Sequence, residues 1–163
     1  MLEECVDEGW LFTGENYICD LRSVGVLMRD GRILVQRERN GNEYALPGGH
    51  VTIGETTEAT LIREYMEEAD AAIRVNRLLW TEECFWQWNG HQVHNIAFYY
   101  LIELLDEHDL PLRDEPFAHK DNDDVLLEWM PVDCLSRITI YPSFIQQEIN
   151  CLNGEIKHFV SRA

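Results

Sequence analysis

The chain has 163 residues, 45% of them hydrophobic, which is enough to bury one hydrophobic core but not two. Thirteen basic residues stand against thirty acidic ones, and the formal net charge is -17 at pH 7. An acidic excess of this size repels nucleic acid and anionic membranes, and no basic patch offsets it. The composition therefore predicts a single domain with neither nucleic acid nor membrane as a partner.

Residues 1–10 are acidic and contain no apolar run. They predict neither a signal peptide nor a membrane span, so the expected location is the cytoplasm. The cysteines are odd in number, widely spaced and without a Cys-x-x-Cys pair, which favours reduced, mostly buried thiols over a zinc site. They are Cys5, Cys19, Cys84, Cys134 and Cys151.

The first predicted hairpin comes early in the chain. Residues 18–28 and 33–37 are rich in apolar side chains and flank Asp30-Gly31, a dipeptide that favours a type I′ turn. Residues 44–46 then form a short strand before a Pro-Gly-Gly turn, where glycines let the backbone approach a ligand closely.

Residues 57–69 are predicted to form a helix. Each helical residue turns by about 100°, so Glu64, Glu67 and Glu68 share one face. Three carboxylates at this spacing repel one another by a few tenths of a kcal/mol per pair, and a bound divalent cation would reverse that sign. We expect the opposite face to be buried against a core, and that face consists of Ala59, Ile62, Tyr65, Met66 and Ala69.

The second half of the chain predicts a longer hairpin, because residues 73–88 and 92–104 flank Asn89-Gly90. Residues 105–124 are polar, acidic and contain proline, which is typical of a loop. After this loop we expect a strand over residues 125–130, a short helix over 131–135 that begins at its proline, and apolar residues at helical spacing over 142–152.

The acidic helix has two interpretations. Most glutamate faces are simply solvated, but here no lysine lies one turn away and a glycine turn precedes the helix. The segment resembles the motif of the Nudix hydrolases, Gly-x5-Glu-x7-Arg-Glu-hydrophobic-x-Glu-Glu-x-Gly-hydrophobic. It departs from that motif at Tyr65, at Asp70 where the family has glycine, and at Ala71. The matching positions are Gly49, Glu55, Arg63, Glu64, Glu67 and Glu68.

This resemblance implies an α/β fold, specifically a Nudix-type α/β/α sandwich with a mixed β-sheet. The hydrolase domain is expected over residues 18–153, with its motif at 49–71. Residues 1–17 would then be an N-terminal extension and residues 154–163 a C-terminal tail.

The resemblance also implies a site for Mg²⁺ or Mn²⁺, hard cations that prefer oxygen ligands. Its metal ligands would be the carbonyl of Gly49 and the carboxylates of Glu64, Glu67 and Glu68. Arg63 would orient these carboxylates through charge-assisted hydrogen bonds, and Glu55 would pair with Arg63. Glu64 is our choice of general base.

The base varies within this family and can come from a carboxylate outside the motif. The sequence offers Glu82, Glu83, Glu115, Asp121, Asp123 and Asp124 for that role. The DNDD run that contains the last three of them is more often a solvated loop. Side chains that could contact the substrate are Arg37, Arg39, Tyr44, Glu83 and Asp123, and Phe85, Trp86 or Trp88 could stack on a ring.

The implied reaction is attack of water on a phosphorus atom of a nucleoside diphosphate linked to another group. A generic nucleotide pyrophosphohydrolase is the first choice. A pyrophosphatase acting on ADP-ribose or nucleotide sugars is the alternative, although Trp86 stands where the ADP-ribose enzymes have proline. A catalytically silent nucleotide sensor is a third reading, since fold alone does not decide function. The expected partner is a small nucleotide diphosphate, and the sequence allows a homodimer.

Overall fold

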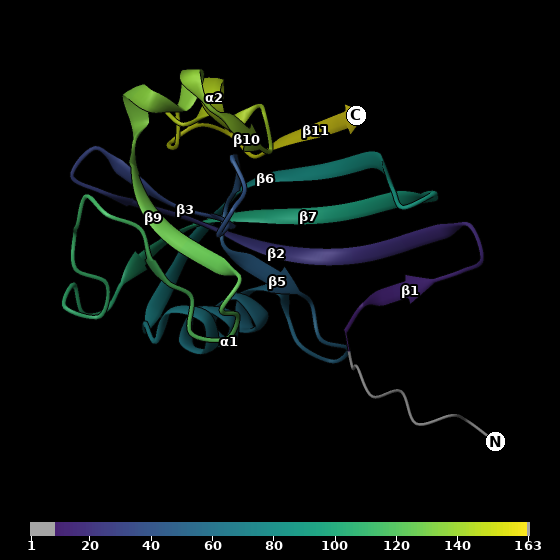
Figure 1. Cartoon of the computed structure of the whole chain (residues 1–163), viewed down its shortest axis with the longest axis horizontal. Coiled ribbons are helices and arrows are strands. Elements are labelled where there is room, and N and C mark those ends of the chain that lie inside the picture. Colours follow the sequence, from purple (N-terminus) through teal and green to yellow (C-terminus); the bar gives the residue numbers. More distant parts are fainter. Residues whose placement is uncertain (1–8, 163) are drawn as a thin grey trace.

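The computed structural model of the chain describes residues 9–162, which form a mixed α/β fold with an 11-stranded sheet (Figure 1). Its strands are β1 (Leu11–Thr13), β2 (Tyr17–Arg29), β3 (Arg32–Glu38), β4 (Glu43–Ala45), β5 (Gly48–His50), β6 (Ile73–Trp88), β7 (His91–Leu104), β8 (Phe117–Ala118), β9 (Val125–Pro131), β10 (Thr139–Tyr141) and β11 (Lys157–Arg162). Its helices are α1 (Thr57–Ala69), the 3-10 helix η1 (Val132–Arg137) and α2 (Ile145–Glu148).

Strand β2 lies at the centre of the sheet, whose main path runs β10-β4-β3-β2-β7-β6-β11. It pairs parallel with β7 and antiparallel with β1, β3 and β5. Strand β9 pairs with β3, and β8 pairs with β9. Parallel and antiparallel pairs therefore occur in one sheet, as the predicted fold class requires.

Both predicted hairpins are confirmed, and the type I′ turn predicted at Asp30-Gly31 recurs at Asn89-Gly90. Asp30 and Gly31 have φ angles of 47° and 73°, and Asn89 and Gly90 have φ angles of 48° and 83°. Positive φ at both central residues matches the twist of the flanking strands. Each turn thus joins its two strands as a tight hairpin, β2–β3 and β6–β7.

Helix α1 has the predicted bounds, and both of its ends are capped. The Thr56 hydroxyl accepts a hydrogen bond from the Ala59 amide at 3.1 Å. Asp70 ends the helix in the left-handed conformation, at φ 53° and ψ 41°. Its amide donates back to the Met66 carbonyl. Asp70 thus adopts the conformation for which the Nudix motif has glycine.

The predicted buried face of α1 is wrong at three of its five positions. Ala59 is exposed, and the side chains of Ile62 and Met66 are 45% and 47% exposed. The helix instead buries Thr60, Leu61, Tyr65 and Ala69. The Tyr65 ring packs so closely on Gly25 of β2 that a Cβ there would overlap it. This contact turns the acidic face toward β5 instead of leaving it opposite the sheet.

Two hydrophobic clusters cover the two faces of the sheet. The cluster under α1 contains Leu27, Leu34, Leu61, Tyr65 and Trp129. The cluster on the opposite face contains Val26, Val35, Trp80, Leu135 and Ile145, the last two from η1 and α2. Consecutive residues such as Val26 and Leu27 belong to different clusters because strand side chains alternate between faces. Helices therefore lie on both sides of the sheet, and Figure 1 shows α1 and α2 on opposite sides.

The end of the chain differs from the prediction. Helix α2 covers only Ile145–Glu148, because the chain turns at residue 151 on its way to β11. The predicted domain limits of 18 and 153 leave out β1 and β11, and both strands join the sheet. Strand β11 is fixed by buried Glu82, which accepts hydrogen bonds from Ser161 Oγ at 2.5 Å and from the Tyr99 hydroxyl at 2.6 Å.

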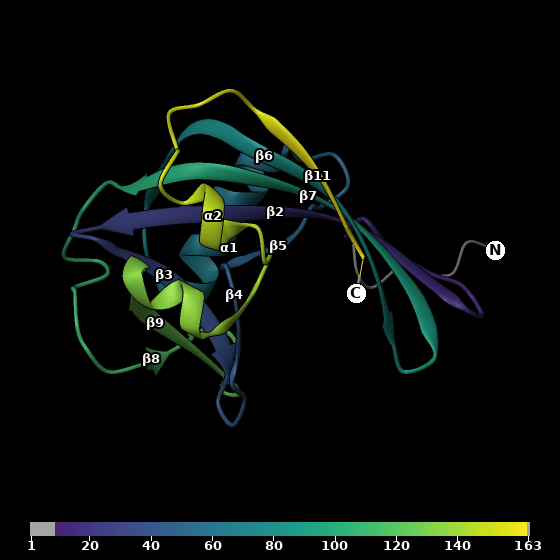
Figure 2. The ribbon, with the colours of Figure 1, turned by 90° about the horizontal axis from the view of Figure 1, so that it is seen from above.

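Strands β2, β6 and β7 extend beyond the helices as an arm, best seen in Figures 1 and 2. No helix within residues 9–162 is long and apolar enough to cross a membrane. The cysteines of this part are free, but the expectation of mostly buried thiols is wrong. Cys19, Cys84 and Cys134 are partly buried and Cys151 is exposed, while Cys5 lies outside the described residues.

Candidate functional site

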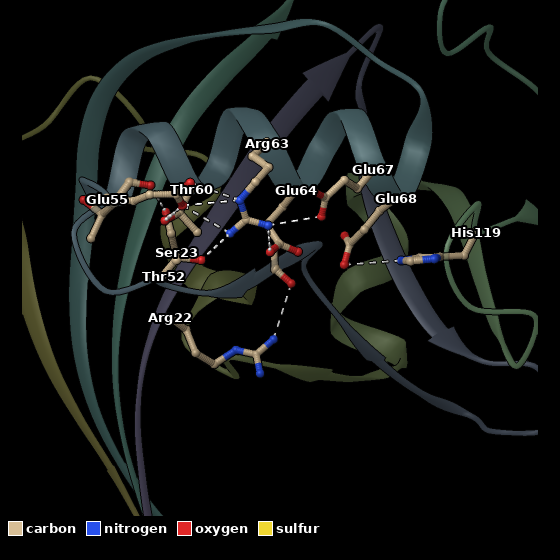
Figure 3. Close-up of polar contacts among 12 residues, drawn as sticks. Arg22, Ser23, Thr52, Glu55, Thr60, Arg63, Glu64, Glu67, Glu68 and His119 are labelled. Atoms are coloured by element: carbon tan, nitrogen blue, oxygen red, sulfur yellow. Dashed lines mark hydrogen bonds and ion pairs between the residues drawn. The ribbon is translucent and has the colours of Figure 1, made fainter. Parts of the chain in front are cut away.

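A cavity of about 340 Å³ lies where α1 faces β5, β2 and the loop before β9. The motif helix and the loop thus meet around one hollow, and Figure 3 shows several of the side chains at this place with their polar contacts. Those that bear on its chemistry are Arg22, Gly49, Arg63, Glu64, Glu68, His119 and Asp121.

The glycines of β5 allow backbone and carboxylate to come together. A Cβ on Gly48 would overlap the Ser23 carbonyl of β2, and a Cβ on Gly49 would overlap the Glu64 carboxylate. Any larger residue at either position would therefore push β5 away from β2 or from α1. Glycine keeps the Gly49 backbone directly against the carboxylate.

Arg63 connects four side chains around one guanidinium (Figure 3). Its Nη1 donates to Glu64 Oε1 at 2.8 Å and to Glu67 Oε2 at 3.1 Å. Its Nη2 donates to Thr52 Oγ1 at 3.0 Å, and Nε and Nη2 both reach Glu55 at 3.2–3.3 Å. These hydrogen bonds from Arg63 are the main cause that lowers the pKa of Glu55. The predicted pair of Glu55 and Arg63 is present.

Glu68 has the opposite environment. Its side chain is 14% exposed, and its Oε2 atom has no hydrogen-bond partner among the described residues. Burial, followed by the negative charge of Glu64, raises the pKa of Glu68 to about 8. Without a cation, Glu68 therefore keeps its proton to a higher pH than an exposed glutamate does. A nearby divalent cation would favour its ionised form.

The loop before β9 approaches the C-terminal end of α1. The Lys120 amide donates to the Glu68 carbonyl at 2.7 Å. The buried His119 ring places Nε2 3.4 Å from Glu68 Oε1, and its Nδ1 accepts from the amides of Asp121 and Asn122. Burial lowers the pKa of His119. The ring is therefore neutral at pH 7 and joins the loop to the helix.

The oxygen ligands in the cavity suit a divalent cation that takes only some of its ligands from the protein. Within residues 9–162, no three His, Cys, Asp or Glu side chains are arranged to enclose a metal ion. Glu64 and Glu68 line the cavity, whereas Glu67 is half-exposed and turned toward Arg63. Mg²⁺ commonly uses one or two carboxylates and completes its shell with water and substrate phosphate. The partnerless Glu68 Oε2 and the close Gly49 backbone suit that manner of binding.

A model of the NUDIX domain matches residues 20–146 of the chain. The chain belongs to the Nudix hydrolase family. Over 58 residues it is 38% identical to the "ADP-ribose pyrophosphatase" of Methanocaldococcus jannaschii, a match that covers 34% of each protein. The chain matches 34% of the length of this relative and 29% of a second one, the "Putative mutator protein MutT4" of Mycobacterium tuberculosis. It therefore spans about a third of the curated relatives it matches.

Solved Nudix structures share the fold. The NUDIX hydrolase from Nitrosomonas europaea superposes with a TM-score of 0.62 at 12% identity, covering 93% of this chain and 82% of that one. The MutT NUDIX hydrolase from Burkholderia pseudomallei gives 0.52 at 25% identity, covering 80% and 96%. These similarities agree with the mixed α/β architecture.

All of the predicted substrate residues lie outside the cavity lined by the Nudix motif. Arg37 pairs with Glu128 at 3.4 Å, and its guanidinium lies 5.9 Å from the centre of the Tyr44 ring. Arg39 donates two hydrogen bonds to the Asp123 carbonyl. These contacts link β3, β4 and the loop before β9. None of these residues lines the cavity.

The remaining candidates belong to the arm. Glu83 bonds to His158 at 3.1 Å between β6 and β11. Phe85 and Trp86 line a second cavity of about 600 Å³, which is lined by no Asp or Glu. Without carboxylates this second cavity lacks the ligands that a hard cation needs. The Nudix motif cavity therefore remains the candidate active site.

Sequence reasoning missed two side chains of this site. Arg22 comes from β2, and its Nη2 lies 3.4 Å from the Gly48 carbonyl. The pairing of β5 with β2 brings it there, and this pairing has no local sequence signal. His119 is also placed by a long-range contact. Of the carboxylates considered outside the motif, Asp121 is the one that lines the cavity.

Proposed function

We propose that this protein hydrolyses a diphosphate bond in a nucleotide or nucleotide derivative with the help of Mg²⁺ or Mn²⁺. The observation that carries the proposal is the pair of partly buried carboxylates, Glu64 and Glu68, beside the Gly49 backbone, where one oxygen of Glu68 has no hydrogen-bond partner within residues 9–162. Buried acidic groups of this kind are costly unless a cation compensates them. Membership of the Nudix hydrolase family supports the same chemistry.

Four residues at the cavity or next to it are proposed to bind the cation. When bound, a divalent cation supplies charge neutralisation at the phosphoryl oxygens and acidifies water. Gly49, Glu64, Glu67 and Glu68 are the proposed ligands. Glu67 would have to leave its contact with Arg63 to take part.

The arginines act on either side of these ligands. Arg63 holds Glu64 in place through its planar fork, with Glu55 fixing the guanidinium from behind. Arg22 lines the cavity with its side chain 33% exposed and suits contact with a phosphate of the substrate.

Two carboxylates are candidates for the general base. Glu64 remains our first choice because it lines the cavity from the motif helix. Its Oε1 accepts from Arg63, which leaves the other oxygen to take a proton from water. Asp121 lines the same cavity from the loop. If Asp121 is the base, Asp121→Asn will lose the acidic limb of the pH–rate profile, where the rate rises as the base loses its proton, while Glu64→Gln retains it.

The substrate class has one specific alternative. The relative from Methanocaldococcus jannaschii carries the name "ADP-ribose pyrophosphatase", which favours ADP-ribose or a nucleotide sugar over a nucleoside triphosphate. The formal charge of -17 repels nucleic acid and also a polyphosphate substrate, so substrate binding would depend on the cations and on arginines such as Arg22. A cytoplasmic location and a homodimer stay predictions of the sequence.

The decisive experiment is a phosphohydrolase assay on a panel of substrates. The panel contains nucleoside triphosphates, nucleotide sugars, ADP-ribose and dinucleotides, each with Mg²⁺, with Mn²⁺ and with excess EDTA. We expect turnover of at least one class with either cation and none with EDTA. Activity that is equal in EDTA would exclude the cation. No turnover of any member, together with tight binding of one, would favour the nucleotide sensor.

A further inference from the structure

We infer that His119 is a positioning residue for the site, a role that rests on the proposed function. The side chain is 5% exposed and comes from the loop between β8 and β9. Its two ring nitrogens contact two different parts of the site. The inference is that one ring sets both the orientation of the Glu68 carboxylate and the course of residues 119–122.

The hydrogen bonds of the ring fix its tautomer. Nδ1 accepts from the Asp121 amide at 3.2 Å and from the Asn122 amide at 3.1 Å. A nitrogen that accepts two N–H groups carries no proton, so the proton of the neutral imidazole is on Nε2. Nε2 lies on the side of the ring that faces the Glu68 carboxylate, 3.4 Å from Oε1 (Figure 3).

The contact distinguishes the two oxygens of Glu68. Oε1 faces the His119 N–H, whereas Oε2 is buried and has no hydrogen-bond partner among the described residues. An oriented carboxylate with one free oxygen is prepared for a cation, since partners behind a metal ligand commonly fix its geometry. His119 would hold Glu68 in this orientation before a cation arrives.

The other side of the ring organises the loop. The two amides bonded to Nδ1 belong to Asp121 and Asn122, which both line the cavity, and the Lys120 amide is tied to the Glu68 carbonyl. A histidine that merely completes a loop would need only these Nδ1 bonds. The two functions of the ring can therefore be separated by substitution.

Asparagine and glutamine each imitate one nitrogen of the ring. In His119→Asn the amide oxygen reaches the position of Nδ1 and can still accept from the loop, but nothing reaches Glu68. In His119→Gln the amide nitrogen reaches the position of Nε2 and can still donate to Glu68, but the loop loses its acceptor. His108→Asn is the matched control, because the His108 side chain is 95% exposed in another loop.

The test measures Mn²⁺ binding, from the electron paramagnetic resonance of free Mn²⁺, and hydrogen exchange of the amides of Asp121 and Asn122. We expect His119→Asn to weaken Mn²⁺ binding about tenfold or more with the amides still protected. We expect His119→Gln to keep the Mn²⁺ affinity within about threefold while the amides exchange faster. His108→Asn should change neither, and melting curves establish that all variants fold.

Two outcomes would overturn the inference. If His119→Asn binds Mn²⁺ as the wild type does, the ring does not position Glu68. If both variants weaken Mn²⁺ binding equally, the effect passes through the loop alone. The proposed function fails differently, namely when the wild-type protein itself neither binds Mn²⁺ nor hydrolyses any member of the substrate panel, and the inference then fails with it.

Discussion

The two ends of helix α1 carry the same residue type in opposite environments. Near its start, Glu55 accepts hydrogen bonds from Arg63 and from the Thr60 hydroxyl, and its pKa is lowered. Near its end, Glu68 is partly buried, one of its oxygens has no partner in the part of the chain that the structure describes, and its pKa is raised. Hydrogen bonds from Arg63 lower the pKa of Glu55, whereas burial and the negative charge of Glu64 raise the pKa of Glu68. A carboxylate that the Arg63 guanidinium contacts is stabilised in the charged form. A carboxylate that it does not contact needs another cation for that.

This contrast indicates which part of the cluster is built for stability and which for binding. The Glu55–Arg63 end satisfies its charges within the protein, so it holds a fixed geometry. The Glu68 end leaves a partly buried carboxyl group that protein groups compensate only in part, because burial and the charge of Glu64 outweigh the charge of Arg22. Such incompletely compensated groups are expected at sites where a ligand supplies the missing charge. The predictions below test that division.

The largest effect is expected for Glu68→Gln. Removing a metal ligand should reduce kcat by on the order of 100- to 1,000-fold, since a catalytic cation contributes several kcal/mol to transition-state stabilisation. The fold should remain intact, and its metal-free melting temperature should equal or exceed that of the wild type because a buried acid is removed. Steady-state kinetics and melting curves check both statements.

Glu67→Gln is the companion variant and Glu58→Gln the control, because Glu58 is an exposed glutamate in the first turn of the same helix. Glu58→Gln should leave kcat unchanged. Near-normal rates in both Glu67→Gln and Glu68→Gln would show that these carboxylates do not hold the cation.

The next effect concerns Arg63, which links the two ends. Lysine keeps the charge but cannot reproduce hydrogen bonds to Glu55, Glu64, Glu67 and Thr52 from one planar group. Arg63→Lys should lower kcat at least tenfold, about 1.4 kcal/mol of transition-state stabilisation, with a melting temperature lower by only a few degrees. An unchanged kcat on the substrate that the panel identifies would mean that Arg63 has no orienting role.

A smaller effect is the pH dependence of metal-free stability that arises from Glu68. Its pKa rises from 4.5 to about 8 on folding, so between these pH values the folded state binds more protons than the unfolded state. The free energy of unfolding should therefore fall as the pH rises through this window. Mg²⁺ should reduce the fall by stabilising the ionised form.

Urea unfolding between pH 5 and 8, with EDTA or with Mg²⁺, measures this slope for the wild type and for Glu68→Gln. The variant should lose the part of the slope that belongs to Glu68. Identical slopes in the two proteins would refute the raised pKa.

Local signals were sufficient for much of the fold. The Asp30-Gly31 and Asn89-Gly90 turns and the bounds of α1 follow from short-range chemistry, and the structure has all three. The buried face of α1 could not be predicted in this way, because the helix packs on the sheet through Leu61 and Thr60 as well as Tyr65, and the contact of Tyr65 with Gly25 is long-range. Helical spacing states which residues share a face but not which face meets the sheet.

In the candidate site too, local sequence signals predicted some residues and long-range contacts place the others. The motif residues are contiguous enough for their spacing to place them together. Arg22 and His119 reach the cavity only through sheet pairing and loop packing, which no short window of sequence encodes. The charged candidates Arg37 and Arg39 were chosen for their type alone, and the structure engages both in contacts elsewhere. Long-range contacts therefore limited the site prediction more than the motif did.

The smallest expected effect completes the contrast between the two glutamates. The folded pKa of Glu55 is lowered below 4.5, mainly by the Arg63 hydrogen bond. Its contribution to stability is therefore fully present above pH 4.5 and is lost as the pH falls through the folded pKa. Because the side chain is 31% exposed, solvent screening keeps that contribution below about 1 kcal/mol.

Glu55→Gln should accordingly lower the free energy of unfolding by less than about 1 kcal/mol at pH 7, about 2–4 °C in melting temperature at most. The difference from the wild type should shrink as the solution is acidified below pH 4.5. This pH dependence has the opposite sign to that of Glu68, and urea unfolding of both variants in one buffer series compares them directly. If the free energy of unfolding of Glu55→Gln stays below that of the wild type by the same amount down to the lowest pH, Glu55 stabilises the protein through packing and not through its charge.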